Sequence, residues 1–187
     1  TIVEEYLKQA VENNSCENGG SCIVMNPKTG DILAMATYPN YDLNSPFTPT
    51  SYYADNWNSL SNEEKNSRIY NMWHVRSVFE TYEPGSVFKL ITAAVALEEN
   101  ITQTDIANDF YCNGVEEVAD KKIQCWYYQA PYYSKHNGQS LREALMHSCN
   151  PSFIQLGKRI GANTLYKYYK AFGLFDKTNS GLPGESS

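Results

Sequence analysis

The run from Val87 to Leu97 constrains this chain most strongly. It is almost entirely apolar, and Lys89 carries the only charge between Glu83 and Glu98. A helix without a polar face is expected to be buried all round. Burial of an ammonium is costly, so Lys89 is expected to have a lowered pKa or a close partner.

Ser86 lies three residues before Lys89, at the start of this predicted helix and on the same face. A serine hydroxyl is a weak nucleophile until a base takes its proton, and a desolvated, neutral lysine is such a base. The helix dipole also favours negative charge that develops at this end. The alternative is structural: a helix-capping serine and a lysine whose stem carries its ammonium to solvent.

A second polar group is Ser148-Cys149-Asn150, which directly precedes Pro151. A hydroxyl and a carboxamide two residues apart on a short turn can point into one cleft. An ordinary polar turn between two helices has the same composition. Each motif alone therefore leaves a structural reading open.

Composition indicates a folded domain and limits its partners. The 187 residues are 42% hydrophobic and 19% charged, with a net charge of −6. A chain with this negative charge lacks the basic surface that nucleic-acid-binding proteins use. No stretch approaches the roughly 18 apolar residues of a membrane span, and no signal peptide begins at Thr1. We expect a piece of a longer protein, with any anchor outside this chain.

Apolar periodicity predicts a hairpin followed by helices. The predicted helices cover residues 2–13, 62–70, 140–147, 151–161 and 164–172, and the predicted strands cover 22–25 and 32–37. A capping box is expected at Ser140 and Glu143. Residues 38–75 are expected to form a long surface excursion. Two strands make a poor sheet, so further strands are expected beyond Ser187.

The motifs and their surroundings resemble the transpeptidase domain of high-molecular-weight penicillin-binding proteins, and class B in particular. The segments that carry the resemblance are VMNPKTGDILAMATYPNYDLN at 24–44, YEPGSVFKLITAAVALE at 82–98, LREALMHSCNPSFIQLGKRIG at 141–161 and GLFDKTNSGLPGE at 173–185. The resemblance covers nearly the whole chain.

The resemblance implies an α/β fold of the α+β kind, in which an antiparallel five-stranded sheet lies between helices beside a mostly helical subdomain. Residues 1–187 would be one partial domain. Its opening helix and hairpin would occupy 1–44, and its helical subdomain and catalytic motifs 45–187. The C-terminal strands, with the third motif of the family, would be absent.

The implied activity is that of a D,D-transpeptidase, which crosslinks peptidoglycan stem peptides through a serine acyl-enzyme and is trapped by β-lactams. Ser86 would be the nucleophile and Lys89 its base. Ser148 would relay a proton to the leaving nitrogen, and Asn150 would bind the substrate amide. The backbone N–H of Ser86 would supply half of an oxyanion hole.

The third family motif, K-[ST]-G on a late strand, has no candidate after Asn150. Lys28-Thr29-Gly30 spells it, but this segment precedes Ser86 and follows Pro27 in a turn between two strands. Because the catalytic version pairs with substrate as a strand, we expect Lys28 to lie outside the site.

Three of the five cysteines and two histidines form a possible metal site that brackets the second motif. The candidate ligands are Cys112, Cys125, His136 and Cys149, with His147 or Asp109 as alternatives. Their spacing is too wide for a zinc finger. If Ser148 and Asn150 point into the cleft, Cys149 should point away, toward the polar loop 109–138. Unlinked thiols, a structural zinc and a Cys112–Cys125 disulfide all remain open; catalysis itself would need no cofactor.

The alternatives for function are a serine β-lactamase, which shares the acylation chemistry, and a β-lactam sensor that acylates and signals. For the transpeptidase, the implied partners are stem peptides, β-lactams and other cell-wall synthesis proteins. The implied location is the outer face of the cytoplasmic membrane.

Overall fold

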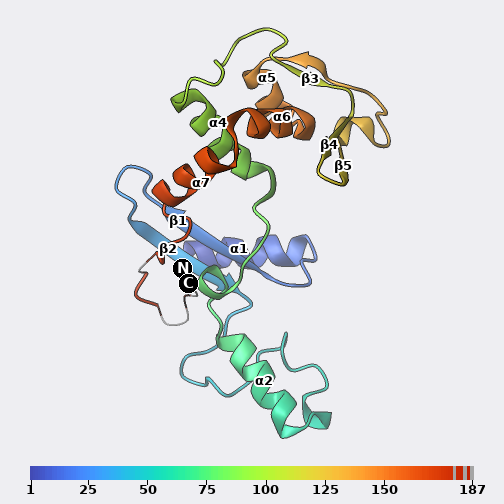
Figure 1. Ribbon diagram of the computed structural model, residues 1–187. Coiled ribbons are helices and arrows are strands. Elements are labelled where there is room, and N and C mark those ends of the chain that lie inside the picture. Colours follow the sequence, from blue (N-terminus) through green and yellow to red (C-terminus); the bar gives the residue numbers. More distant parts are fainter. Residues whose placement is uncertain (179, 183–184, 186–187) are drawn as a thin grey trace. The chain divides into compact units, whose positions relative to one another are not determined.

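The computed structural model describes residues 1–178, 180–182 and 185. Its contacts divide the chain into two compact units (Figure 1). One unit is Thr1–Thr81 together with the segment that starts at Thr178, and the other is Tyr82–Lys177. The boundary expected after residue 44 stays a prediction about the complete domain.

The first unit opens with helix α1 (Ile2–Asn13) and an antiparallel hairpin of β1 (Gly20–Met25) and β2 (Ile32–Tyr38). Thr1 and Glu4 form a capping box that begins α1. The helix packs on both strands and buries Val11. The predicted helix and hairpin are therefore confirmed, each within two residues of the expected bounds.

Lys28 lies in the turn of this hairpin, outside both strands, and is exposed. Its backbone N–H donates to the Asn26 side chain (3.0 Å), and Gly30 has a φ of 79° that suits glycine. This segment is a closed turn and not a strand edge, as the sequence indicated.

The excursion that follows contains η1 (Trp57–Ser59), α2 (Asn62–Trp73) and the short α3 (Arg76–Phe79). A capping box of Ser61 and Glu64 begins α2. The helix runs three residues beyond its predicted end. Trp73 extends it because its ring packs edge-on against Phe47 (centroids 5.2 Å apart) and its Nε1 donates to the Pro46 carbonyl (2.8 Å).

The second unit is built around helices. They are η2 (Gly85–Phe88), α4 (Lys89–Glu98), α5 (Leu141–Met146), α6 (Asn150–Ile160) and α7 (Ala162–Ala171). Their core includes Val95, Ala96 and Leu156, each with no exposed surface. The predicted capping box at Ser140 and Glu143 begins α5.

The prediction that residues 87–97 are buried on every side is wrong for this structure. Val87, Leu90 and Leu97 are 64%, 59% and 39% exposed. Helix α4 packs on α5, α6 and α7 along one side only, so the side that carries Val95 and Ala96 is the buried one.

The polar loop before α5 contains four short strands that apolar periodicity did not reveal. They are β3 (Phe110–Cys112), β4 (Val115–Val118), β5 (Lys121–Gln124) and β6 (Asn137–Gln139), with η3 (Trp126–Tyr128) between β5 and β6. They pair antiparallel as β3–β6 and β4–β5. Gly114 joins β3 to β4 at a φ of 94°, where a Cβ atom would lie 2.4 Å from the Tyr128 ring.

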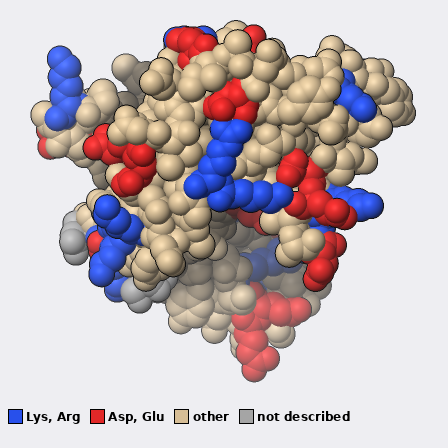
Figure 2. Space-filling view, turned by 45° about the horizontal axis from the view of Figure 1, so that its top comes forward, with Lys and Arg blue, Asp and Glu red and all other residues tan. Residues whose placement is uncertain are grey.

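Helices and small antiparallel sheets together confirm the α+β class. On the face that Figure 2 shows, acidic and basic side chains are interspersed, and no continuous basic patch forms there. Among the described residues, no helix has the length and apolar character needed to cross a membrane.

Candidate active site and metal cluster

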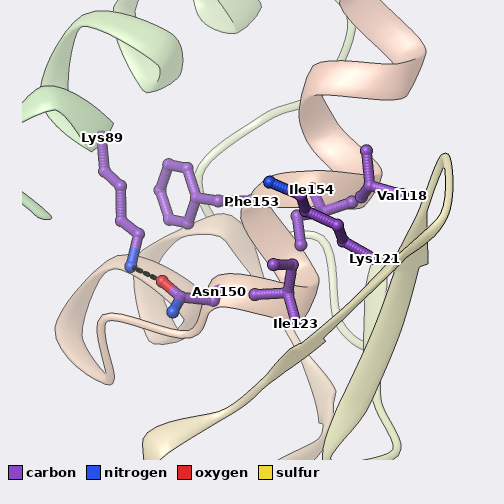
Figure 3. A pocket seen from close by; sticks show the side chains of 7 residues that line it. All are labelled: Lys89, Val118, Lys121, Ile123, Asn150, Phe153 and Ile154. Atoms are coloured by element: carbon purple, nitrogen blue, oxygen red, sulfur yellow. Dashed lines mark hydrogen bonds between the residues drawn. The ribbon is translucent and has the colours of Figure 1, made fainter. Parts of the chain in front are cut away.

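Lys89 is the centre of a group of polar contacts between α4 and the turn that joins α5 to α6. Its Nζ donates to the Ser148 carbonyl (2.8 Å), the Ser148 Oγ (3.1 Å) and the Asn150 Oδ1 (2.6 Å; Figure 3). The same Nζ is 3.3 Å from the Ser86 Oγ. The two sequence motifs, about sixty residues apart, therefore meet at one ammonium.

Ser86 lies in η2, one turn before Lys89 along the same helical path, and its side chain is exposed. The Ser148 Oγ donates to the Ser86 Oγ at 2.8 Å. Ser86, Ser148 and Lys89 thus close a triangle of hydrogen bonds. Since hydroxyl protons rotate freely, a proton on Ser86 has both a direct and a relayed path to the lysine.

Burial disfavours the charged form of Lys89. Burial lowers the pKa of Lys89, although the nearby thiols of Cys149 and Cys125 act in the opposite direction. Its four hydrogen-bond contacts are all to uncharged oxygen atoms. The Phe153 ring lies 5.5 Å from the ammonium in a cation–π contact, which favours the charged form, so burial is what lowers the pKa of Lys89. Such a lysine is suited to accept a proton.

Ser148 is held in an uncommon backbone conformation by the end of α5. The backbone N–H of Cys149 bonds to the Ala144 carbonyl (2.9 Å) and that of Ser148 to the Leu145 carbonyl (3.0 Å), the two bonds of a Schellman motif. Ser148 takes the left-handed position of this motif, with a φ of 49°, where glycine is usual. Strain of this kind gathers at functional sites.

Asn150 begins α6, and Pro151 follows in the first turn, where its missing N–H is not needed. Asn150, Phe153 and Ile154 lie on one face of the helix. With the β4–β5 hairpin they line a pocket of about 430 Å³ that Lys89 also borders (Figure 3).

On the other side of the same turn lies a metal-ligand cluster. The donor atoms of Cys112, Cys125, His136 and Cys149 all lie within 4.8 Å of one another. The three cysteines are fully buried. Three sulfurs and one imidazole at these separations suit a tetrahedral ion such as Zn²⁺, and the cluster could hold a metal. Cys149 thus lies toward loop 109–138, on the side that the sequence predicted.

Neighbouring groups orient these ligands. The Ser152 Oγ donates to the Cys149 Sγ (3.3 Å). The His136 ring stacks on His147 at a centroid distance of 4.7 Å. Second contacts of this kind fix ring orientation in metal sites.

The two alternative ligands lie elsewhere. The His147 Nδ1 is 2.7 Å from the Gln139 Oε1, and Asp109 pairs with Arg159 (2.7 Å). All five cysteines are free thiols, so the Cys112–Cys125 disulfide is not formed in this structure.

The thiols differ in their acidity. Burial raises the pKa of Cys112 and raises that of Cys125 to about 12. Burial also acts to raise the pKa of Cys149, but hydrogen bonds from the Ser152 side chain and backbone outweigh it and lower the pKa. Without a cation, these buried thiols therefore have unequal tendencies to ionise.

Comparison with known proteins decides the family. A model of the family "Penicillin binding protein transpeptidase domain" matches residues 20–187. The chain belongs to the penicillin-binding protein transpeptidase family. The resemblance in the sequence motifs is thereby confirmed, and the structure is a fragment of the transpeptidase fold.

Individual relatives agree with this assignment. Stage V sporulation protein D of Bacillus subtilis is 36% identical over 188 residues, which cover 100% of this chain and 25% of that protein. Peptidoglycan D,D-transpeptidase PbpA of Mycobacterium tuberculosis (strain H37Rv) is 35% identical over 157 residues, 83% of this chain and 30% of that protein. The chain thus spans about a quarter to a third of these relatives.

A solved structure gives the same picture. Penicillin-binding protein A from M. tuberculosis, as an imipenem acyl-enzyme complex, superposes with a TM-score of 0.68 and 29% identity. The match covers 90% of this chain and 37% of that one. That relative therefore forms an acyl-enzyme with imipenem.

Several residues that shape the site escaped the sequence analysis. Phe153 covers the lysine, Ser152 and Gln139 support the cluster, and Lys121 borders the pocket. Phe153 and Ser152 had a signal, since each lies one turn after a motif residue, Asn150 or Cys149. Gln139 and Lys121 depend on contacts between separate segments and had none.

The conformation of Ser148 leads to a test with two matched variants. Ser148→Gly and Ser148→Ala both remove the hydroxyl, but only glycine adopts a φ of 49° without strain. The glycine variant should therefore be more stable than the alanine variant by about 1 kcal/mol in urea unfolding. Both should slow acylation about a hundredfold or more, because the relay is lost. Equal stability of the two variants would contradict the strained conformation.

The cluster leads to a metal measurement. Protein purified without added metal should contain about one equivalent of zinc. Cys112→Ser should lose the metal, whereas Cys22→Ser, a half-buried cysteine outside the cluster, should keep it. A zinc content below about a tenth of an equivalent, with every thiol open to alkylation, would exclude a resident zinc.

Proposed function

We propose that this protein is a serine D,D-transpeptidase that crosslinks peptidoglycan stem peptides. The observation that carries the proposal is the contact of Lys89 with both Ser86 and Ser148. Membership of the transpeptidase family supports it, as does the name D,D-transpeptidase borne by the M. tuberculosis relative. Because the chain spans only part of its relatives, the activity belongs to the complete domain.

In the first step, neutral Lys89 takes the Ser86 proton, either directly or through Ser148. The Ser86 Oγ attacks the carbonyl of the penultimate D-Ala and forms a new C–O bond. Negative charge then develops on the carbonyl oxygen near the start of η2, where backbone N–H groups favour it. The exposed position of Ser86 leaves its hydroxyl accessible to a peptide.

In the second step, the C–N bond to the terminal D-Ala breaks. Lys89 supplies a proton, and the Ser148 hydroxyl relays it to the leaving nitrogen. Asn150 binds the amide of the donor peptide and keeps it in register with Ser86. An amine of a neighbouring stem peptide then attacks the acyl carbon and forms a new C–N bond, while neutral Lys89 takes the proton of the amine. The C–O bond to Ser86 breaks, and Lys89 passes this proton to the Ser86 Oγ, which restores the free enzyme.

The same site explains β-lactam inhibition. A β-lactam carbonyl takes the place of the D-Ala carbonyl, and its C–N bond opens in the acylation step. A serine β-lactamase and a β-lactam sensor share this acylation. No observation in the described residues favours either of them, whereas the M. tuberculosis relative PbpA carries the name D,D-transpeptidase.

The same reasoning gives the location and partners. A transpeptidase of stem peptides acts at the outer face of the cytoplasmic membrane, and we place the protein there, with its anchor outside this chain. Its partners would be stem peptides, β-lactams and other cell-wall synthesis proteins.

For the metal cluster we propose a structural zinc that Cys112, Cys125, His136 and Cys149 hold. These residues come from β3, the β5–η3 junction, the loop before β6 and the start of α6. A zinc would join these segments and fix Cys149, and with it the Ser148 and Asn150 on either side. Serine acylation itself would need no metal.

Covalent labelling tests the proposed function. A fluorescent penicillin should label the complete transpeptidase domain, and peptide mapping should place the label on Ser86. Ser86→Ala should abolish labelling, while Ser134→Ala, a serine of the same compact unit outside the site, should leave it unchanged. A label on any other residue would refute the assignment of the nucleophile.

A further inference from the structure

The pocket beside the candidate site has apolar walls and a cation at its border. Phe153 and Ile154 of α6 form one wall, and Val118 and Ile123 of the β4–β5 hairpin form the other (Figure 3). The volume, about 430 Å³, is enough for a short aliphatic side chain. Asn150 borders this pocket. If a peptide amide binds to Asn150, the side chain next to that amide would therefore lie at the pocket.

The alternation of side chains along β5 places Lys121 at this pocket. Lys121 and Ile123 lie on one face of the strand and both line the pocket. Lys122 lies on the opposite face, 3.9 Å from Glu117. In Figure 3 the Lys121 side chain extends across the pocket toward Phe153.

Nothing that lines the pocket neutralises Lys121. Its ionisable lining residues are two lysines, Lys89 and Lys121. The neighbouring glutamates are engaged elsewhere, Glu116 with Lys158 (2.7 Å) and Glu117 with Lys122. In the part of the chain that the structure describes, no carboxylate lies within ion-pair distance of Lys121. The pocket therefore offers apolar surface and an unpaired ammonium to a ligand.

We propose that this pocket binds the side chain of the acyl donor, and that it selects an aliphatic chain that ends in a carboxylate. The carboxylate would pair with Lys121, while the methylene groups contact Phe153 and Ile123. This inference rests on the proposed function, because it assigns the specificity of the same site. Lys121 is then a specificity-determining residue.

The hairpin that carries Lys121 is fixed to α6. The Lys158 Nζ bonds to the Glu116 side chain (2.7 Å) and to the Glu117 carbonyl (2.8 Å). Gln155 donates to Glu116 at 3.1 Å. These bonds hold β4 and β5 over the face that presents Asn150 and Phe153, so both walls of the pocket keep a defined spacing.

Two penicillins with matched side chains test the proposal on the complete transpeptidase domain. One has an aliphatic side chain that ends in a carboxylate, and the other ends in the isosteric carboxamide. The wild type should be acylated about two- to fivefold faster by the anionic compound, as expected for an ion pair with the exposed Lys121. Lys121→Gln should abolish this preference, so that the two compounds acylate it at the same rate. Lys122→Gln, on the opposite face, should keep the preference.

The outcomes separate this inference from the proposed function. An equal preference in the wild type and Lys121→Gln, with Ser86 labelled in both, would overturn the pocket assignment alone. If neither penicillin labels Ser86, the proposed function fails, and the same two compounds then report on the pocket through equilibrium binding measured by NMR. Tighter binding of the anionic compound that is lost in Lys121→Gln would support the pocket, and equal binding would overturn it.

Discussion

The site depends on a half-buried lysine whose hydrogen-bond contacts are all to neutral oxygen atoms. A carboxylate beside Lys89 would stabilise its charge and remove its use as a base. The serine and asparagine oxygens satisfy its N–H groups with a weaker effect on the charge than a carboxylate would have, and burial lowers the pKa of Lys89. The core between α4 and α6 keeps the two motifs at hydrogen-bond distance. Burial, and no ion pair, thus lowers the pKa of Lys89, the proposed base.

One tripeptide connects the two functional features of the second unit. Ser148 and Asn150 face Lys89, while the Cys149 between them belongs to the metal-ligand cluster. The Schellman motif at the end of α5 turns the chain so that these neighbouring side chains point in opposite directions. In this motif Ser148 has a left-handed backbone conformation. A metal bound at the cluster would hold the strained turn from its far side. The proposed catalytic and structural roles therefore meet in three consecutive residues.

Two kinds of feature could be predicted from the sequence: those that depend only on neighbouring residues, and a charge whose burial costs free energy. Ser140 and Glu143 marked the start of α5 because a capping box needs only four residues, and the isolated charge of Lys89 marked the site. The β3–β6 pair could not be predicted, since three-residue strands have no periodicity. Lys121 escaped notice because its role depends on a hairpin that packs on α6. The half-exposed α4 shows that an all-apolar helix need not be covered within the described residues.

The ionisation of Lys89 tests the central claim most directly. In the complete domain, the pKa of its Nζ can be followed by NMR of the 13C-labelled lysine side chain, with Lys89→Arg to assign the signal. The account predicts a pKa below the ordinary 10.5, and an acylation rate that rises with pH through the same range as the amine loses its proton. A pKa at or above 10.5 would contradict the account, because Lys89 would then stay charged and could not accept the Ser86 proton.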